Sequence, residues 1–347
     1  MTLSETAALA LSFLGRASTA HPKGGERSFY GFKTIALGGV EQTMLVRAAD
    51  LRKPVLLFLH GGPGSPELPQ AVRLSKKIES EFTVVIWDQR GCGKSYAGDL
   101  AIEISKDRLV DDAIELVQRL RSEYKQDRIL LMGHSWGTIL GMNLLAKIPE
   151  NIALFISVGQ VVDFKRNEEL SYRRLLSVVK EKGAEKDIKT LLEIGAPVDG
   201  LYADPIKSLM KQRAILLKHG LVYYGKRDAG EVVKLILLAP EYTLREKLRY
   251  GKNQLSIINR MWNRDLMATD FISQLPRVSV PVCFMVGESD FNTPKELVVE
   301  YYNKLSAPYK KLVTFSKSGH DPHVEELDSF VKEFAAFVEE LKLYMHT

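Results

Sequence analysis

The chain has 347 residues, of which 45% are hydrophobic and 26% charged, and its formal net charge is +5 at pH 7. This length is enough for one large or two ordinary globular domains with a sizeable core. The two cysteines, Cys92 and Cys283, exclude a disulfide framework and a zinc-binding spacing, and the absence of any basic run excludes a nucleic-acid interface.

An apolar run at residues 7–14 predicts an N-terminal helix at about residues 4–15 that packs on the body of the protein. No Lys or Arg precedes this run, and the run is too short to cross a bilayer. No other stretch reaches transmembrane length, so we expect a cytoplasmic protein that has no membrane partner.

Short apolar segments alternate with helical patterns through the first 159 residues. Two segments around Gly38 and Gly39 have the composition of a hairpin. The later strands are continuously apolar and alternate with helices, which predicts a largely parallel sheet covered on both faces. The expected strands are residues 32–37, 41–48, 54–59, 82–87, 128–132 and 153–158, and the expected helices are residues 69–80, 105–123 and the segment after Ser135.

Residues 160–270 depart from this alternation, because they contain no convincing central strand. Their apolar residues recur at helical spacing. The expected helices are residues 164–182, 185–194, 205–219, 231–238 and 242–264. We interpret this segment as a helical cap inserted into a core of residues 1–159 and 271–347. The core resumes with a strand near residues 280–287, a helix, a strand near residues 312–315 and a final helix near residues 322–344.

The most informative motif is Gly133-His134-Ser135-Trp136-Gly137, which follows an apolar strand and precedes a helical pattern. A serine hydroxyl becomes a nucleophile when a sharp turn exposes it and a base activates it. Glycine at the flanking positions relieves the crowding of such a turn. Ser135 is therefore the candidate nucleophile.

A second glycine-rich loop, His60-Gly61-Gly62-Pro63-Gly64, also follows an apolar strand. Acyl transfer places negative charge on a carbonyl oxygen, and fixed backbone N–H groups stabilise that charge. The expected donors are the N–H of Gly62 in this loop and the N–H of Trp136 after the nucleophile.

An acid and a histidine complete the set. Asp290 follows the strand near residues 280–287, and His320 follows the strand near residues 312–315. The order Ser135, Asp290, His320 is the order expected on an α/β-hydrolase fold. His323 is the rival base, but it is expected to begin the final helix. Cys92 has no strand-turn-helix context, and we interpret it as structural.

These segments together resemble the α/β-hydrolases of the prolyl iminopeptidase-like branch. The resemblance covers residues 30–158 and 275–343. It rests on the two glycine motifs above, on Asp88-Gln89-Arg90-Gly91-Cys92-Gly93-Lys94-Ser95, on the turn from Gly287 to Asp290 with Thr293-Pro294, and on Ser318-Gly319-His320. It implies an α/β-hydrolase fold with a mostly parallel sheet flanked by helices.

The supporting residues are expected to shape the oxyanion loop rather than to contact the substrate. His60 and His134 are expected to pack and to form hydrogen bonds around their turns. Asp88 and Arg90 are expected to brace the loop through an ion pair or backbone hydrogen bonds. Gly61, Pro63 and Gly64 complete the loop itself.

The leading functional hypothesis is a serine hydrolase that cleaves a small ester, lactone or amide through an acyl-enzyme. In it, Ser135 attacks, His320 transfers the proton and Asp290 orients the imidazole. This chemistry requires no metal and no organic cofactor. The sequence does not indicate an oligomeric state.

Two alternatives remain open. The first is a prolyl iminopeptidase or related aminopeptidase, acting on a short peptide. It needs acids to bind the free amino terminus, and the candidates are Glu168, Glu169, Glu241 and Asp265. The family's usual cap motif is absent. Residues 160–270 contain 21 Lys and Arg against 15 Asp and Glu, and this positive balance disfavours an aminopeptidase. The second is a non-catalytic ligand-binding protein on a hydrolase scaffold, which the complete triad disfavours.

Residues suited to an apolar pocket are Tyr223, Tyr224, Met261, Trp262 and Met267.

Overall fold

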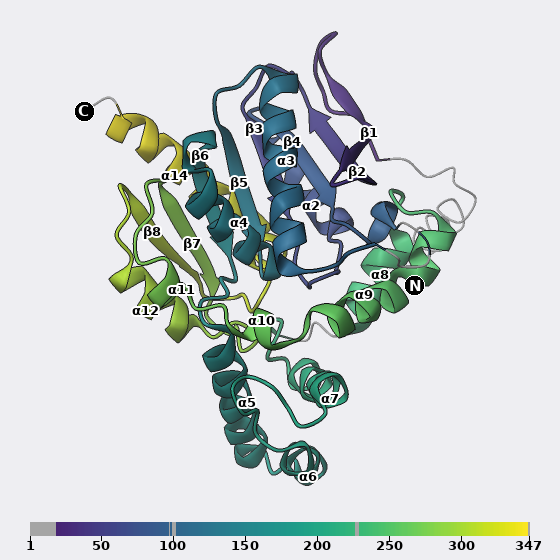
Figure 1. Ribbon diagram of the computed structural model, residues 1–347, viewed down its shortest axis with the longest axis vertical. Coiled ribbons are helices and arrows are strands. Elements are labelled where there is room, and N and C mark those ends of the chain that lie inside the picture. Colours follow the sequence, from purple (N-terminus) through teal and green to yellow (C-terminus); the bar gives the residue numbers. More distant parts are fainter. Residues whose placement is uncertain (1–18, 97, 99–101, 226–228, 346–347) are drawn as a thin grey trace.

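The computed structural model describes residues 19–96, 98, 102–225 and 229–345 (Figure 1). The N-terminal helix expected at residues 4–15 lies outside them. Within the described residues, eight strands form one sheet in the order β1-β2-β4-β3-β5-β6-β7-β8. The strands are β1 Phe29–Leu37, β2 Val40–Ala48, β3 Val55–Leu59, β4 Thr83–Asp88, β5 Ile129–His134, β6 Ile152–Val158, β7 Val282–Gly287 and β8 Lys310–Phe315.

The sheet is mostly parallel, as the sequence predicts. β1 and β2 form an antiparallel hairpin, β2 pairs antiparallel with β4, and the remaining neighbours are parallel. All residues of β3, β4, β5 and β7 are buried. Strands without a polar face need apolar cover on both sides of the sheet.

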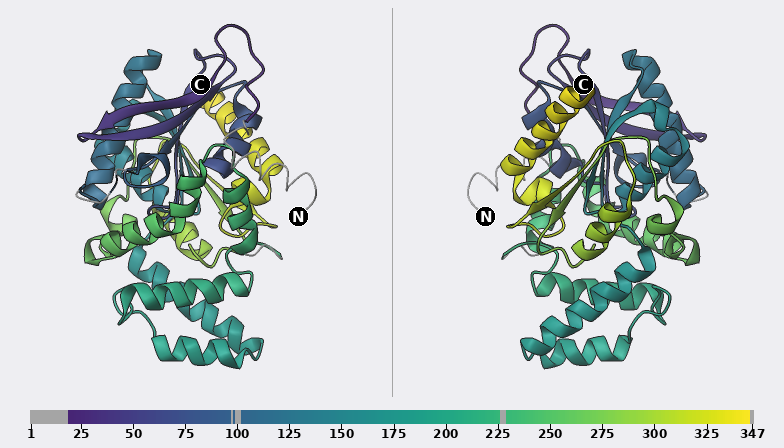
Figure 2. Two further views of the ribbon diagram at one scale, coloured as in Figure 1. Left: turned by 90° about the vertical axis from the view of Figure 1, so that its right-hand side faces the viewer. Right: turned by 90° about the vertical axis from the view of Figure 1, so that its left-hand side faces the viewer.

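Helices provide that cover on both faces (Figures 1 and 2). α2 Leu68–Ile78 and α14 Leu327–Met345 pack on one face and share a core cluster with the side chains of β3 to β7 that point that way. α3 Lys106–Tyr124, α4 Trp136–Lys147 and α12 Lys295–Lys304 pack on the other face. Each fully buried large apolar side chain stabilises the fold by about 1.5–3 kcal/mol.

α4 lies unusually close to the sheet because it contains two glycines at its contact face. A Cβ on Gly137 would overlap the carbonyl group of Leu59 at the end of β3. A Cβ on Gly141 would overlap the ring of Phe155 in β6. Both glycines therefore allow α4 to approach the sheet, and the start of α4 is held against the ends of the central strands.

A helical insertion, residues 163–270, separates β6 from β7. Its helices are α5 Phe164–Glu181, α6 Glu185–Ile194, α7 Pro205–Lys218, α8 Ala229–Leu238, α9 Leu244–Met261 and α10 Arg264–Met267, and α11 Phe271–Gln274 follows it. Its two ends meet in an isolated bridge between Asp163 and Asp270. α5, α6 and α7 form a separate layer beyond the sheet in Figure 2.

Two predicted helices are interrupted. The helix expected at residues 242–264 ends at Met261, because the Asn263 side chain accepts hydrogen bonds from the N–H groups of Asp265 and Leu266 and starts α10. The final helix is divided at Glu326 into α13 Pro322–Glu325 and α14. The Glu326 carboxylate instead accepts hydrogen bonds from Lys317 N and Ser318 Oγ.

Two short 3₁₀ helices, Gly93–Ser95 and Pro149–Asn151, follow β4 and α4. In the described parts of the chain, every helix is too short or too polar to span a lipid bilayer.

Candidate active site

Ser135 lies in the turn between β5 and α4, as the motif predicts. Its backbone has φ 51° and ψ −118°, a conformation that few non-glycine residues adopt and that costs about 1–3 kcal/mol. The turn is fixed by a 2.9 Å hydrogen bond from Ser135 N to the Val158 carbonyl oxygen. A Cβ on Gly133 would overlap the Gly137 carbonyl group, so the turn requires glycine there. Ser135 is therefore held directly before the N-terminus of α4.

His320 and Asp290 form a hydrogen-bonded pair at the carboxyl ends of the strands. The distance from His320 Nδ1 to Asp290 Oδ2 is 2.8 Å. Asp290 also accepts hydrogen bonds from Thr293 Oγ1 at 2.6 Å and from the N–H groups of Asn292 and Thr293, each at 2.8 Å. An ionised carboxylate only accepts, so the proton belongs on Nδ1 of His320, and Nε2 is left to act as a base.

The Asn292 side chain forms a hydrogen bond with His320 Nε2. Asn292 Nδ2 is the donor, at 3.1 Å. Ser135 and His320 line the same pocket, but among the described residues no hydrogen bond joins their side chains. Sequence reasoning did not identify Asn292. Its position two residues after Asp290 was the only available signal.

The pocket has a volume of about 380 Å³ and lies between the sheet and the helical insertion. The core contributes Ser135, Trp136, Gly62 and His320, and the insertion contributes Phe164, Asn167 and Glu168 of α5, Leu209 and Arg213 of α7, Tyr250 and Ile258 of α9, and Trp262. Of the expected apolar lining, Tyr223 and Trp262 line the pocket. Tyr224 is exposed instead, and Met261 and Met267 are buried in the core.

Gly62 and Trp136, the expected oxyanion donors, both line the pocket beside Ser135. Within the described ranges, neither of their N–H groups takes part in a backbone hydrogen bond. The Gly62 backbone has φ 116°, which favours glycine. Both donors are thus available to an oxygen atom in the pocket.

His60 and Gln89 hold the oxyanion loop to the nucleophile turn. Gln89 N donates to His60 Nε2 at 3.1 Å, and Gln89 Nε2 donates to the His60 carbonyl oxygen at 2.9 Å. Trp136 Nε1 donates to Gln89 Oε1 at 3.0 Å. Burial lowers the pKa of His60 to about 4, so its imidazole is neutral and accepts the Gln89 N–H. Gln89 belongs to the motif at residues 88–95, but the sequence alone indicates no role for it.

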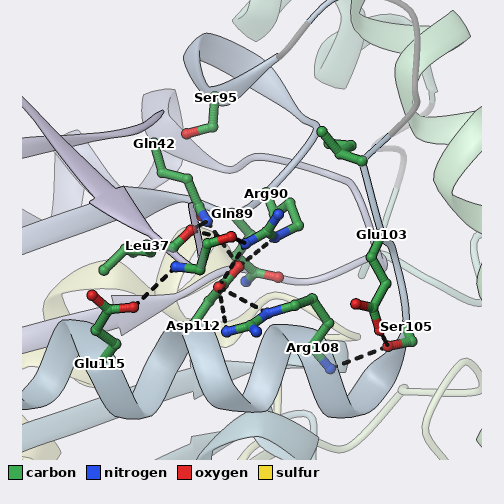
Figure 3. Close-up of polar contacts among 12 residues, drawn as sticks. Leu37, Gln42, Gln89, Arg90, Ser95, Glu103, Ser105, Arg108, Asp112 and Glu115 are labelled. Carbon is green, nitrogen blue, oxygen red and sulfur yellow. Dashed lines mark hydrogen bonds and ion pairs between the residues drawn. The ribbon is translucent and has the colours of Figure 1, made fainter. Parts of the chain in front are cut away.

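The bracing role expected for Asp88 and Arg90 is wrong. Asp88 accepts hydrogen bonds from Lys94 N at 2.9 Å and from Tyr242 Oη at 3.1 Å, and burial raises its pKa to about 7. Arg90 forms an ion pair with Asp112 of α3 (Figure 3). Since Asp88, Gln89 and Arg90 point to different neighbours at the end of β4, only Gln89 reaches the oxyanion loop.

The Arg90 contacts stabilise the edge of the sheet. Arg90 donates to Asp112 at 2.6 and 2.8 Å and to the Leu37 carbonyl oxygen at 2.8 Å. Asp112 also accepts from Gln42 at 2.8 Å and from Arg108 at 3.1 Å (Figure 3). Both Arg90 and Asp112 are buried, so each charge depends on the other.

Asp112→Asn is expected to lower the free energy of unfolding by about 3–5 kcal/mol, because it leaves the buried Arg90 guanidinium without its counter-ion. Chemical denaturation measures this loss. The neighbouring exposed Asp111 provides the matched control, and Asp111→Asn should change the stability by less than about 0.5 kcal/mol. Equal effects of the two substitutions would contradict this interpretation.

The two cysteines are buried. Cys92 Sγ donates to the Gln89 carbonyl oxygen at 2.9 Å, and burial raises the pKa of its thiol. A thiol with a raised pKa is a poor nucleophile at neutral pH. Cys283 lies inside β7, where burial also raises the thiol pKa. These contacts agree with a structural role for both residues.

His323, the rival base, lies on α13 and does not line the pocket. Its ring packs against Phe58 and Phe330. Burial and the charge of His134 lower its pKa to about 3. It is therefore placed behind the site and away from Ser135.

A cluster of acids and imidazoles lies beneath Ser135. Ligand atoms of Glu67, His134 and His323, and likewise of His134, His320 and Asp321, lie within 4.8 Å of one another, a spacing that a metal ion could bridge. Both ring nitrogens of His134 already face protein acceptors, however. We therefore interpret Glu67, His134 and Asp321 as a hydrogen-bonded network, whereas neither ring nitrogen of His323 has a hydrogen-bond partner among the described residues. Glu67 and Asp321 were not identified from the sequence.

Among the four acids considered for the pocket, only Glu168 lines it. Its carboxylate is fully buried on α5. Oε1 accepts from Arg213 at 2.5 Å and from Asn167 Nδ2 at 3.2 Å, whereas Oε2 has no protein partner in the part of the chain described here.

Comparison with known proteins agrees with this geometry. A family described as "alpha/beta hydrolase fold" matches residues 54–186. The probable aminopeptidase YbaC of Bacillus subtilis is 30% identical over 312 residues, covering 88% of this chain and 95% of that protein. The proline iminopeptidase of Heyndrickxia coagulans is 26% identical over 290 residues, covering 82% of this chain and 90% of that protein.

Solved structures show the same fold. The crystal structure of the proline iminopeptidase of Mycobacterium smegmatis superposes with a TM-score of 0.62 at 18% identity, covering 90% of this chain and 99% of that one. The resemblance inferred from the motifs is confirmed: the chain belongs to the α/β-hydrolases, in the proline iminopeptidase-like branch.

Proposed function

We propose that the protein is a serine hydrolase that releases the N-terminal residue of a short peptide or related amide. In this mechanism Ser135 attacks the carbonyl carbon, and His320 accepts the hydroxyl proton at Nε2. His320 then returns the proton to the leaving amine, and water repeats the sequence on the acyl-enzyme. The strained turn at Ser135 and the 2.8 Å contact between His320 and Asp290 support these roles.

The N–H groups of Gly62 and Trp136 would bind the oxygen atom that becomes negative during the attack. Two preorganised donors in a site shielded from water lower the barrier by several kcal/mol. Asp290 would stabilise the imidazolium form of His320. Before the attack, His320 Nε2 must exchange its contact with Asn292 for one with the Ser135 hydroxyl.

The choice of substrate rests on Glu168, whose buried carboxylate has one oxygen without a partner among the described residues. A buried carboxylate oxygen without a partner is costly, and a substrate ammonium group would satisfy Glu168 Oε2. Asn167 joins Glu168 to the loop of Asp290, because its Nδ2 also donates to the Asn292 carbonyl oxygen at 2.9 Å, and the Asn292 side chain contacts His320. The amino group of an N-terminal residue is two bonds from the scissile carbonyl carbon, so its acceptor must lie near the base.

We also propose that residues 160–270 act as a cap over this site. Side chains of α5, α7 and α9 line the pocket opposite Ser135. Such cover excludes water and strengthens electrostatic contacts with the substrate. The residues that recognise the substrate would then come mainly from the insertion, and the reacting groups from the core.

A small ester or lactone is the second candidate substrate. It is favoured by the ion pair of Glu168 with Arg213, which already neutralises one charge in the pocket. The apolar side chains of Leu209, Ile258 and Trp262 suit an uncharged acyl group equally well.

An assay with three substrates separates the candidates. The purified protein is given a p-nitrophenyl short-chain ester, a proline or alanine arylamide, and the same arylamide with its amino group acetylated. An aminopeptidase turns over the free arylamide and spares the acetylated one. Turnover of the ester alone would replace our proposal with the second candidate. Absence of all turnover, together with no fluorophosphonate labelling of Ser135, would indicate a ligand-binding protein.

Glu168→Gln is expected to lower kcat/KM for the free arylamide about 10- to 100-fold, since a hydrogen bond to a charged group contributes about 1.5–3 kcal/mol. Turnover of an uncharged ester should change little. Glu169, the next residue, does not line the pocket and provides the matched control as Glu169→Gln. An equal loss on ester and arylamide would show that Glu168 supports the pocket without binding an amine.

A further inference from the structure

His134 lies at the end of β5, next to the nucleophile, and is almost completely buried. Its Nδ1 is 2.8 Å from Glu67 Oε1. Its Nε2 is 3.1 Å from Asp321 Oδ1 and 3.1 Å from the His320 carbonyl oxygen. The side chain is thus enclosed by acceptors on both sides.

This geometry fixes the protonation state of His134. A neutral imidazole has one N–H donor, so one ring nitrogen would direct a lone pair at an acceptor oxygen. Only the imidazolium donates from both nitrogens. Burial by itself lowers the pKa of His134, but the charges of Glu67 and Asp321 and their hydrogen bonds raise it well above its usual value. Burial has the opposite effect on Asp321 and raises its pKa. The charge and hydrogen bond of His134, with smaller contributions from His320 and His323, nevertheless hold the pKa of Asp321 below its usual range.

The contacts of His134 join three loops that meet at Ser135. Glu67 Oε1 also accepts the N–H of Gly61, at 3.2 Å, in the oxyanion loop. A Cβ on Gly61 would lie 3.2 Å from Ser135 Cβ and 3.3 Å from His134 Nδ1, so these groups are near neighbours. On the other side, the contact with the His320 carbonyl oxygen reaches the backbone of the base itself.

We propose that His134, as a cation held between Glu67 and Asp321, is a positioning residue for the reaction. It fixes the oxyanion loop and the loop of His320 relative to the nucleophile turn. This inference rests on the proposed serine-hydrolase mechanism and adds a requirement to it: the site is assembled only while His134 carries two ring protons. Loss of one proton removes one of the two links, and small displacements of reacting groups can lower rates about 100-fold.

The titratable groups around His134 come from several elements. Glu67 precedes α2, His60 follows β3, His320 and Asp321 precede α13, and His323 lies on α13. The rings of His320 and His323 each have their centroids 4.8 Å from that of His134. Burial lowers the pKa of His60 and of His323, so both are neutral at pH 7. The carboxylates of Glu67 and Asp321 are therefore the main source of the negative field at His134.

Glu67→Gln tests the proposal, because a glutamine oxygen keeps the hydrogen bonds from Gly61 and His134 but lacks the charge. Without that charge the pKa of His134 should fall by about 1–3 units. The fluorophosphonate labelling rate of Ser135 is measured against pH. We expect its decline at alkaline pH to begin about 1–3 pH units lower in Glu67→Gln than in the parent protein, with little change in the rate at pH 6.

Two further measurements complete the test. NMR of the protein with ¹⁵N-labelled histidine reports the ring protons of His134 independently of activity, and we expect both nitrogens to be protonated at pH 7. Glu326→Gln is the matched control, because Glu326 binds the loop of His320 through Lys317 and Ser318 without contacting His134. In Glu326→Gln the labelling rate of Ser135 should begin to decline at the same alkaline pH as in the parent protein.

A singly protonated His134 at pH 7, or an unchanged alkaline decline in Glu67→Gln, would overturn the proposal. Both results leave the serine mechanism standing as long as Ser135 is labelled. Absence of labelling in the parent protein would instead contradict the proposed function, while the NMR result would still decide the state of His134.

Discussion

Ser135→Ala is expected to lower kcat about 10⁶-fold and to leave the fold intact. The loss is large because, in the proposed mechanism, the hydroxyl oxygen forms the covalent bond, and the remaining groups provide only binding and oxyanion stabilisation. The strained backbone at Ser135 is set by its glycine neighbours, so alanine should adopt it at a similar cost. Steady-state kinetics on the preferred substrate measures the loss, and thermal unfolding checks the fold.

Ser65 provides a control in the same pocket, where its Oγ contacts Gln254. Ser65→Ala should change kcat less than tenfold. Cys92→Ala tests the other possible nucleophile and should likewise retain activity, provided that the variant folds. If Cys92→Ala lost as much activity as Ser135→Ala while remaining folded, the structural interpretation of Cys92 would be wrong.

Asp290→Asn is expected to lower kcat about 10⁴-fold with little change in stability. The Asn side chain can present an N–H to His320 Nδ1 and so favours the tautomer whose proton is on Nε2, where it blocks proton transfer from Ser135. It also removes the charge that stabilises the imidazolium. A pH profile of kcat/KM gives a second reading, because the remaining activity should depend less on the protonation of His320.

Glu288, on the same turn as Asp290, provides the control for this substitution. It is exposed and pairs with Lys295 at 2.5 Å. Glu288→Gln should leave kcat within a factor of two. A loss below tenfold in Asp290→Asn would exclude Asp290 as the partner of His320 in the reaction, whatever its geometry in the resting protein.

The strands and the turn at Ser135 could be predicted because each is encoded by neighbouring residues. Apolar runs such as residues 55–59 predict buried strands, and the glycines around Ser135 indicate a crowded turn. Such patterns are local and therefore visible in one sequence.

Contacts that depend on three-dimensional packing could not be predicted. Asp112, which holds Arg90, lies 22 residues away on a helix, and only the fold shows that Arg90 turns away from the oxyanion loop. Glu168 could not be distinguished from Glu169, because the complete burial of Glu168 and the partial burial of Glu169 depend on how α5 packs. The Glu67–His134 pair joins residues 67 positions apart, a separation that no motif spans.

The bridge between Asp163 and Asp270 has a consequence for how new specificities arise in this scaffold. Because the two ends of the insertion lie side by side at this bridge, outside the sheet, the length of the intervening segment is not constrained by the pairing of β6 with β7. The entropic cost of closing a loop rises by only about 0.6 kcal/mol for each doubling of its length, so a longer insertion at this point costs little stability. Under the proposed function, selectivity and reactivity would be encoded in separable stretches of the polypeptide, and one could diversify while the other is retained.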